Sequence, residues 1–294
     1  MFLSESVYSL YPYCKNSNFS GWLSDYSLQK SLQLQKPWVH KSRQSLKKHY
    51  FCSMEWFESW FDTPYYHVLY SNRDYTEAEN FITKLTAKLQ LPPNSKIIDL
   101  ACGKGRHSVF LNKLGYDVLG LDLSRQSIEF DKQFENQTLL FDVHDMRNPI
   151  DADPMDAVFN LFTSFGYFDN ENDDKKVFQS VYNVLKPGGY FVLDYLNEEY
   201  VRKSIVREST IIRGDIEFKI KKKIEGRHIV KDIQFEADGK PYHFFEKVKL
   251  HTLDAINSYA TECGFERVKI WGDYQLNDFN KDTSPRCINL FKKK

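Results

Sequence analysis

The sequence predicts an α/β protein with a doubly wound, seven-stranded, mostly parallel sheet and a small antiparallel β insertion. Three observations support this prediction. Strand-like and helix-like patterns alternate from about residue 54 to 200, which is typical of a parallel sheet covered by helices. A glycine turn, Gly103–Gly105, joins the first strand to a helix. Between about residues 205 and 250, apolar residues recur at every second position, as in an antiparallel meander with one buried face.

The composition is that of a globular protein without a strong charge bias. With 294 residues, 41% of them hydrophobic, the chain can bury a sizeable core. The formal net charge is zero, so nothing global indicates a nucleic-acid partner. Five scattered cysteines without a CxxC pair indicate reduced thiols in a cytoplasmic protein and argue against a cysteine-based zinc site. No apolar run approaches the ~20 residues that span a bilayer, and no signal peptide is recognisable.

Residues 1–53 differ from the rest of the chain. They contain seven Lys or Arg and two acids, many serines and little apolar periodicity. Two interpretations are open: a poorly ordered or non-native extension, with Met54 as the natural initiator, or a basic substrate-binding arm. Because such a segment buries too little surface to offset ordering, we favour the extension. Residues 54–294 are then one domain.

The stretch after Met54 is rich in aromatic residues and reads MEWFESWFDTPYYHVLYSNRD. Most of these rings are expected to pack against the domain. Tyr66 and Tyr70 are candidate ligand contacts in a segment that could cover a site. Thr76 and Glu79 form a predicted capping box, which starts a helix that precedes the first strand.

The first strand, the glycine turn and its helix lie within KIIDLACGKGRHS. Ile97 and Ile98 suit a buried strand, and Gly103 and Gly105 let a ligand approach the backbone at the start of the helix. The same pattern begins dinucleotide-binding domains, where a Gly or Ala usually stands at the position of Ser108. The turn alone therefore leaves two classes of nucleotide site open.

Further strands follow in α/β order. The second strand ends in Asp122, whose carboxylate suits the two hydroxyls of a ribose, and Ser124 can cap the next helix. The predicted strands span residues 117–122, 138–143, 156–162 and 190–195, and the predicted helices between them span residues 124–135 and 172–185.

The pattern changes after the fifth strand. An antiparallel insertion is predicted within residues 200–250, with hairpin turns at Glu225-Gly226 and Asp238-Gly239. One more helix leads to two final strands, residues 265–271 and 286–291. Because only a loop joins these strands, we expect them to pair antiparallel.

The motifs together resemble the class I S-adenosylmethionine-dependent methyltransferases. Five of them occur in the order of that family: IIDLACGKG, LGLDLS, HDM, NLFTSFGYF and LKPGGYFVLDYLN. Each is weak alone, but their order and spacing are specific, and a nicotinamide enzyme would not be expected to contain the LKPGG turn or the final hairpin. The resemblance implies a Rossmann-like methyltransferase fold that binds S-adenosyl-L-methionine. The antiparallel insertion looks like the substrate lid of small-molecule methyltransferases, including those that act on amino sugars.

The resemblance also implies which residues contact this cofactor. They come from the aromatic segment, the glycine turn and the strand ends: Tyr66, Tyr70, Asp99, Ala101, Cys102, Gly103, Gly105, Asp122, Leu123, Asp145, Met146, Asn160, Leu161 and Phe162. Asp122 would hold the ribose hydroxyls and Asp145 the adenine amino group, with Met146 against the ring. His107 would either touch the cofactor carboxylate or be a packed histidine.

The acceptor is expected to be a small molecule that is methylated on nitrogen or oxygen. Tyr167 is the candidate catalytic residue, and Tyr167, Tyr242 and His243 are candidate substrate contacts. A general base is useful if the acceptor is an oxygen or a protonated amine. An RNA or protein methyltransferase and a non-catalytic cofactor-binding protein remain alternatives, although strand four reads NLFT and lacks the Asn-Pro-Pro-Tyr type motif of adenine-DNA methylases. No metal site and no oligomeric state is predicted.

Overall fold

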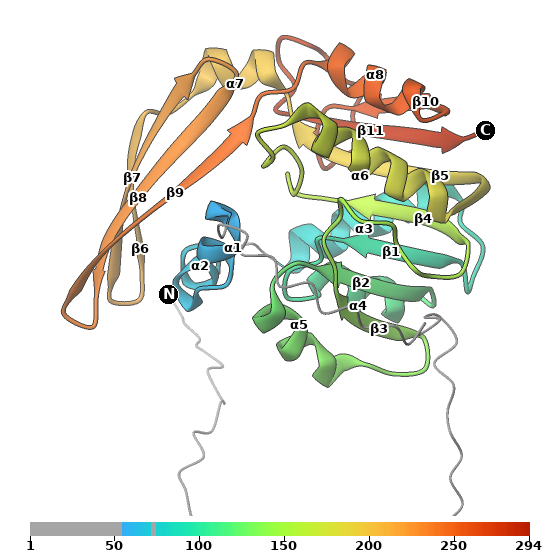
Figure 1. Ribbon diagram of the computed structural model, residues 1–294, viewed down its shortest axis with the longest axis horizontal. Helices are drawn as coiled ribbons and strands as arrows, with labels where there is room; N and C mark the ends of the chain where they lie inside the picture. Colours follow the sequence, from blue (N-terminus) through green and yellow to red (C-terminus); the bar gives the residue numbers. More distant parts are fainter. Residues whose placement is uncertain (1–54, 72–74) are drawn as a thin grey trace, which may run out of the picture. The chain divides into compact units, whose positions relative to one another are not determined.

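The computed structural model describes residues 55–71 and 75–294. In these residues the strands form two sheets, one of seven strands and one of four (Figure 1). No helix in this part of the chain is long and apolar enough to cross a bilayer. The interpretation of residues 1–53 lies outside the described residues.

The seven-stranded sheet is mostly parallel, and the last two strands pair antiparallel, as predicted. Its order is β10-β11-β5-β4-β1-β2-β3, in which the first five strands of the chain run parallel and β11 pairs antiparallel with both β5 and β10. The chain places β2 on one side of β1 and β4 on the other, and ligands bind at such a switch point. The strands are β1 (Lys96–Leu100), β2 (Asp117–Asp122), β3 (Leu139–Val143), β4 (Met155–Asn160), β5 (Leu185–Leu196), β10 (Phe265–Trp271) and β11 (Arg286–Lys293).

Helices cover both faces of this sheet. Neighbouring residues of a strand point to opposite faces, and Ile97 and Ile98 of β1 accordingly belong to different core clusters. The cluster that contains Ile98 includes residues of α6 (Glu171–Val184) and α8 (Leu253–Glu262), and Phe57 of the short helix α1 (Trp56–Phe61). The cluster that contains Ile97 includes residues of three others: α3 (Tyr75–Leu89), α4 (Arg106–Lys113) and α5 (Arg125–Asp131).

Local boundaries differ from the prediction at three places. The capping box is wrong, because α3 begins at Tyr75 and Thr76 therefore lies inside the helix. Strand β4 ends at Asn160, two residues early, because the next turn is left-handed. The LKPGG segment is part of β5: Leu185 pairs with Met155, and pairing resumes after a register shift.

The antiparallel sheet packs against the aromatic segment. Its strands are β6 (Glu208–Arg213), β7 (Ile216–Glu225), β8 (His228–Ala237) and β9 (Lys240–Lys249), preceded by α7 (Glu198–Ser204). The predicted turn at Asp238-Gly239 is present, and the other hairpin turn falls at Gly226-Arg227, one residue later than predicted. One face of the sheet shares a core with two short helices, α1 (Trp56–Phe61) and α2 (Pro64–Leu69). Phe57 of α1 also belongs to a core cluster of the seven-stranded sheet, so α1 contacts the cores of both sheets.

Candidate active site

A cavity of about 390 Å³ lies at the carboxyl ends of the parallel strands. Its lining comes from five stretches of chain, within residues 57–71, 99–107, 122–127, 144–146 and 161–168. All the residues expected to contact a cofactor line this cavity, except Gly105 and Asn160. The sequence motifs, which are spread over the chain, are therefore brought together at one site.

The turn after β1 is shaped by backbone conformations that favour glycine. Ala101, Gly103 and Gly105 all have positive φ, of 63°, 58° and 62°. The N–H groups of Ala101 and Cys102 both donate to Leu121 O of β2, at 2.6 and 3.0 Å, which fixes the start of the turn. Gly103 lines the cavity, whereas Gly105 lies behind it, where a Cβ would stand 2.9 Å from the ring of Phe141.

Asp122 closes the second strand beside this turn. Its Oδ2 accepts from Gly103 N and its Oδ1 from Ser124 N, each at 2.8 Å. Burial raises the pKa of this carboxyl, while the hydrogen bonds from Ser124 and Gly103 oppose the rise. A carboxylate has about four acceptor sites, so two backbone donors leave capacity for two hydroxyls of a ligand.

Asp99 of β1 and Asn160 of β4 are both buried, and their two strands are neighbours in the sheet. Asp99 Oδ2 accepts from Ser108 Oγ at 2.6 Å, and burial raises the pKa of Asp99 to about 6. Asn160 donates from Nδ2 to Leu100 O at 3.0 Å and is fully buried. Asn160 therefore ties β4 to β1, and its side chain does not reach the cavity lining.

A third buried acid was not identified from the sequence. Asp131 of α5 is fully buried, and neither of its carboxylate oxygens has a hydrogen-bond partner among the described residues. Burial, with the nearby charges of Asp122 and Asp99, raises the pKa of Asp131 to about 8. At neutral pH this side chain is therefore mainly a neutral acid behind the glycine turn.

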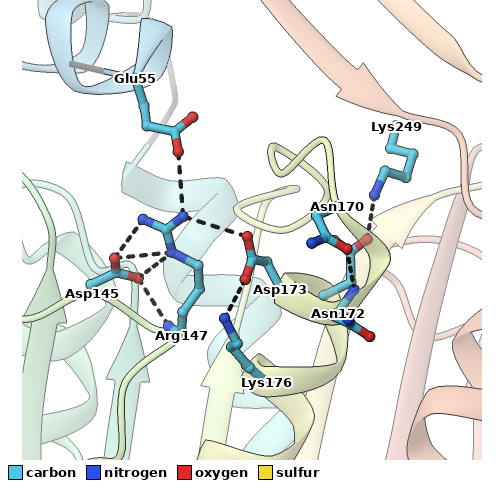
Figure 2. A network of polar contacts seen from close by, with 9 residues as sticks. Glu55, Asp145, Arg147, Asn170, Asn172, Asp173, Lys176 and Lys249 are labelled. Atoms are coloured by element: carbon cyan, nitrogen blue, oxygen red, sulfur yellow. Dashed lines mark hydrogen bonds and ion pairs between the residues drawn. The ribbon is translucent and has the colours of Figure 1, made fainter. Parts of the chain in front are cut away.

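Asp145 is engaged by an arginine (Figure 2). Arg147 Nε lies 3.0 Å from both oxygens of Asp145, and Arg147 Nη2 lies 2.7 Å from Oδ2. Arg147 also forms ion pairs with Glu55 at 3.4 Å and Asp173 at 3.8 Å. Burial raises the pKa of Asp145, but Arg147 outweighs it and lowers the pKa overall. The carboxylate that was expected to accept from adenine is thus already the partner of a cation.

Four aromatic side chains, Phe61, Tyr66, Tyr70 and Tyr167, form an aromatic wall of the cavity. Phe61 and Tyr66 lie 4.9 Å apart between ring centroids, Tyr66 and Tyr70 lie 4.9 Å apart, and Phe61 and Tyr167 lie 5.3 Å apart. All four side chains line the cavity. The Tyr167 hydroxyl donates to Thr163 O at 2.6 Å, which fixes the ring in place.

The other two candidate substrate residues do not line the cavity. Tyr242 stacks on Phe235 within the antiparallel sheet and contacts Tyr65 of α2. His243 has an exposed side chain and binds Asp232 on the neighbouring strand. Among the described residues, no side chain of β6 to β9 lines the cavity. The insertion therefore does not cover this cavity directly.

The model of a family described as a methyltransferase domain matches residues 91–248, more than half of the chain. The chain belongs to this methyltransferase family. The resemblance to class I S-adenosylmethionine-dependent methyltransferases, inferred from the motifs, is thereby confirmed.

Known proteins resemble this methyltransferase in sequence or in fold. A glycine/sarcosine N-methyltransferase from Aphanothece halophytica is 27% identical over 216 residues, which are 67% of this chain and 76% of that protein. An S-adenosylmethionine-dependent methyltransferase from Clostridium acetobutylicum has a TM-score of 0.66 at 20% identity, covering 78% of this chain and 96% of that one. CalS10, an amino pentose methyltransferase from Micromonospora echinaspora, has a TM-score of 0.60 at 16% identity, covering 84% and 100%. The two solved structures show the shared fold.

The cavity of this methyltransferase fits the groups of S-adenosylmethionine. Gly103 presents backbone with no atom within 4 Å of where its Cβ would stand, so a ligand can approach closely. Asp122 keeps acceptor capacity for the ribose, and the aromatic wall suits a sulfonium cation. Asp145 fits less simply, because an adenine amino group would share it with Arg147.

Several lining residues of this methyltransferase were not predicted. His67 lines the cavity, and burial, together with the charge of Lys104, lowers the pKa of His67 to about 4. Ser164 follows the left-handed turn after β4 and also lines the cavity. His107, which was left open, lines the cavity and stacks on Phe162 with ring centroids 4.9 Å apart. Ser164 belongs to the NLFTSFGYF motif and His107 was already a candidate, so only His67 needed the three-dimensional arrangement to be identified.

Proposed function

We propose that this methyltransferase transfers a methyl group from S-adenosyl-L-methionine to a nitrogen or oxygen nucleophile of a small molecule. The observation that supports this most is the shape and chemistry of the cavity. A concave site of about 390 Å³ is in the range of small-ligand pockets. Its acids lie at the strand ends, and its aromatic side chains lie on α1 and α2 and after β4.

The protein's part in such a reaction is alignment and exclusion of water. The cofactor supplies an activated methyl group on its sulfonium. The chain's own residues would hold the ribose at Asp122 and place the acceptor against the aromatic wall, in line for displacement. The faces of Tyr66 and Tyr70 would favour the positive charge near the sulfur.

Tyr167 remains the proposed residue next to the acceptor. Its hydroxyl donates to Thr163 O, so in this arrangement its oxygen can accept a hydrogen bond from an acceptor amine or hydroxyl. His67 also lines the cavity and is neutral near pH 7, but its pKa, lowered to about 4, makes it a weak proton acceptor. Tyr242 and His243, which lie outside the cavity lining, would act only on an acceptor that extends along the sheet.

A small acceptor is also supported by the relatives. The names of the similar proteins include a glycine/sarcosine N-methyltransferase and an amino pentose methyltransferase. For an RNA or protein acceptor, a basic track into the site would be needed. Lys221 and Lys223 are exposed and pair with Glu208 and Glu225, which weakens that alternative.

We further propose that the protein works in the cytoplasm, and that residues 54–294 form its catalytic domain.

Calorimetry with S-adenosylhomocysteine tests the cofactor, and release of this product from S-adenosylmethionine in a screen of small amines and hydroxyl compounds tests the acceptor class. We expect binding and product release with at least one small acceptor. Release only with RNA or a protein substrate would replace the small-molecule proposal. Binding without release for any acceptor class would favour a non-catalytic binding protein, and no binding would refute the site.

A further inference from the structure

The sheet face that packs on α1 and α2 carries a largely buried carboxylate, Glu246 of β9. Its side chain is 14% exposed. It accepts hydrogen bonds from Trp60 Nε1 at 2.9 Å and from the Tyr70 hydroxyl at 2.6 Å. Lys231, the register partner of Glu246 on β8, places its Nζ 3.4 Å from Oε2. One carboxylate therefore joins α1, the residue that caps α2, and a cation of the sheet.

Tyr70 is the member of this group that reaches the cavity. Both oxygens of Glu246 lie within hydrogen-bond distance of its hydroxyl, and Lys231 Nζ donates to the same hydroxyl and lies 4.5 Å from the ring centroid. Trp60 connects Glu246 to a second cavity-lining residue, because the Trp60 ring packs edge-on against Tyr66, with ring centroids 5.6 Å apart. The sheet thus sets the positions of two cavity-lining rings, although none of its described residues lines the cavity.

We propose that Glu246 is a positioning residue, which orients Tyr70 at the cofactor cavity and so makes the antiparallel sheet act on the site through α1 and α2. Without its carboxylate, the Trp60 N–H and the Tyr70 O–H would lose their acceptor in a mostly buried place, and the ring of Tyr70 would no longer be held in one orientation. The inference rests on the proposed function, since it takes the cavity as the cofactor site.

A double-mutant cycle between Glu246 and Tyr70 tests this inference. The variants are Glu246→Leu, Tyr70→Phe and both together, and the measurement is calorimetric binding of S-adenosylhomocysteine. If Glu246 acts through the Tyr70 hydroxyl, each single change weakens binding by about tenfold, and the double change also weakens it by about tenfold rather than about a hundredfold.

Tyr65→Phe is the matched control. Tyr65 also lies on α2 and donates a hydrogen bond to the hairpin turn between β8 and β9, to Asp238 Oδ2 at 3.0 Å, but it does not line the cavity. We expect it to change binding by less than about twofold. Glu246→Gln keeps one acceptor oxygen and should retain binding within about threefold of wild type. If the leucine variant does not fold, Glu246→Ala, which also removes both acceptor oxygens, replaces it in the cycle.

Additive losses in the double variant, or a loss for Tyr65→Phe as large as that for Glu246→Leu, would overturn the positioning role, because either result means a general loosening of the sheet. A wild-type protein that does not bind S-adenosylhomocysteine would overturn the proposed function, and this inference with it. The two failures are therefore distinguished by the wild-type titration alone.

Discussion

Asp194 accepts a hydrogen bond from the backbone N–H of Phe162 at 2.7 Å. Phe162 and Thr163 are consecutive residues with left-handed backbones, with φ of 57° and 63°, and such conformations cost about 1–3 kcal/mol each when a side chain is present. Arg286 of β11 binds the other oxygen of Asp194 at 2.8 Å and donates to Thr163 Oγ1 at 2.7 Å. A buried ion pair therefore holds the strained turn that brings Phe162 to the cavity.

Asp194→Ala should lower the free energy of unfolding by about 3–5 kcal/mol, because Arg286 would be left as an unpaired buried cation and the turn would lose its acceptor. Urea denaturation measures the change. Lys269→Gln is the control, since it removes an exposed ion pair with Asp278 and should cost less than about 1 kcal/mol. Equal costs for the two variants would show that the turn does not depend on Asp194.

Asp122→Asn should weaken binding of S-adenosylhomocysteine by about 10–100-fold. The amide replaces one acceptor oxygen by a donor and removes the charge, while two backbone N–H groups still point at the side chain. Calorimetry measures the loss. Asp117→Asn, at the opposite end of the same strand, should bind as wild type does. Normal binding by the Asp122 variant would move the ribose site elsewhere.

The succession of strands and helices along the chain and the glycine turn could be predicted, because each depends on a local pattern. Periodicity identifies strands, and an acid at a strand end beside a parallel neighbour must lie at the same sheet edge. Asp122 illustrates this: its place at the end of β2 put it in the cavity. The contacts of Asp194 could not be predicted, because they join β5 to the turn after β4 across 32 residues and to β11 across 92 residues.

The sequence also could not predict which part of the protein packs against each face of the inserted sheet. Alternation shows that Tyr242 and Phe244 share a face, but not what covers that face. In the structure that face packs on α1 and α2, so Tyr242 belongs to a separate core and α2 supplies the cavity wall. Asp145 shows a similar limit: the motif placed it at the cavity, but not its pairing with Arg147 two residues later.

Asp131→Asn should remove a pH-dependent loss of stability. In the unfolded chain an Asp titrates near pH ~3.9, whereas burial raises the pKa of folded Asp131 to about 8. The folded state keeps this proton to higher pH, so through this group the free energy of unfolding falls by about 1.4 kcal/mol per pH unit as pH rises from about 4 to about 8. The stability gained by the variant over wild type should therefore grow across this range in urea titrations.

Glu129→Gln is the control for that experiment, because Glu129 is an exposed carboxylate on the same helix. Its difference from wild type should stay flat with pH. A flat difference for Asp131→Asn as well would mean that Asp131 ionises in the folded protein at an ordinary pH.

Gly103→Ala and Gly105→Ala should separate binding from stability within one turn. Gly105 has a φ of 62°, and an added methyl group would stand 2.9 Å from the Phe141 ring. Because backbone strain and overpacking add together, Gly105→Ala should lower the free energy of unfolding by about 2–5 kcal/mol. Gly103 has a φ of 58° and no protein atom within 4 Å of an added methyl, so its cost should be only about 1–2 kcal/mol of strain. Because Gly103 lines the cavity, the space its methyl takes is ligand space, and binding of S-adenosylhomocysteine should weaken at least about tenfold. Urea denaturation and calorimetry on both variants check this, and a Gly103 variant that is unstable but binds normally would place the ligand away from the turn.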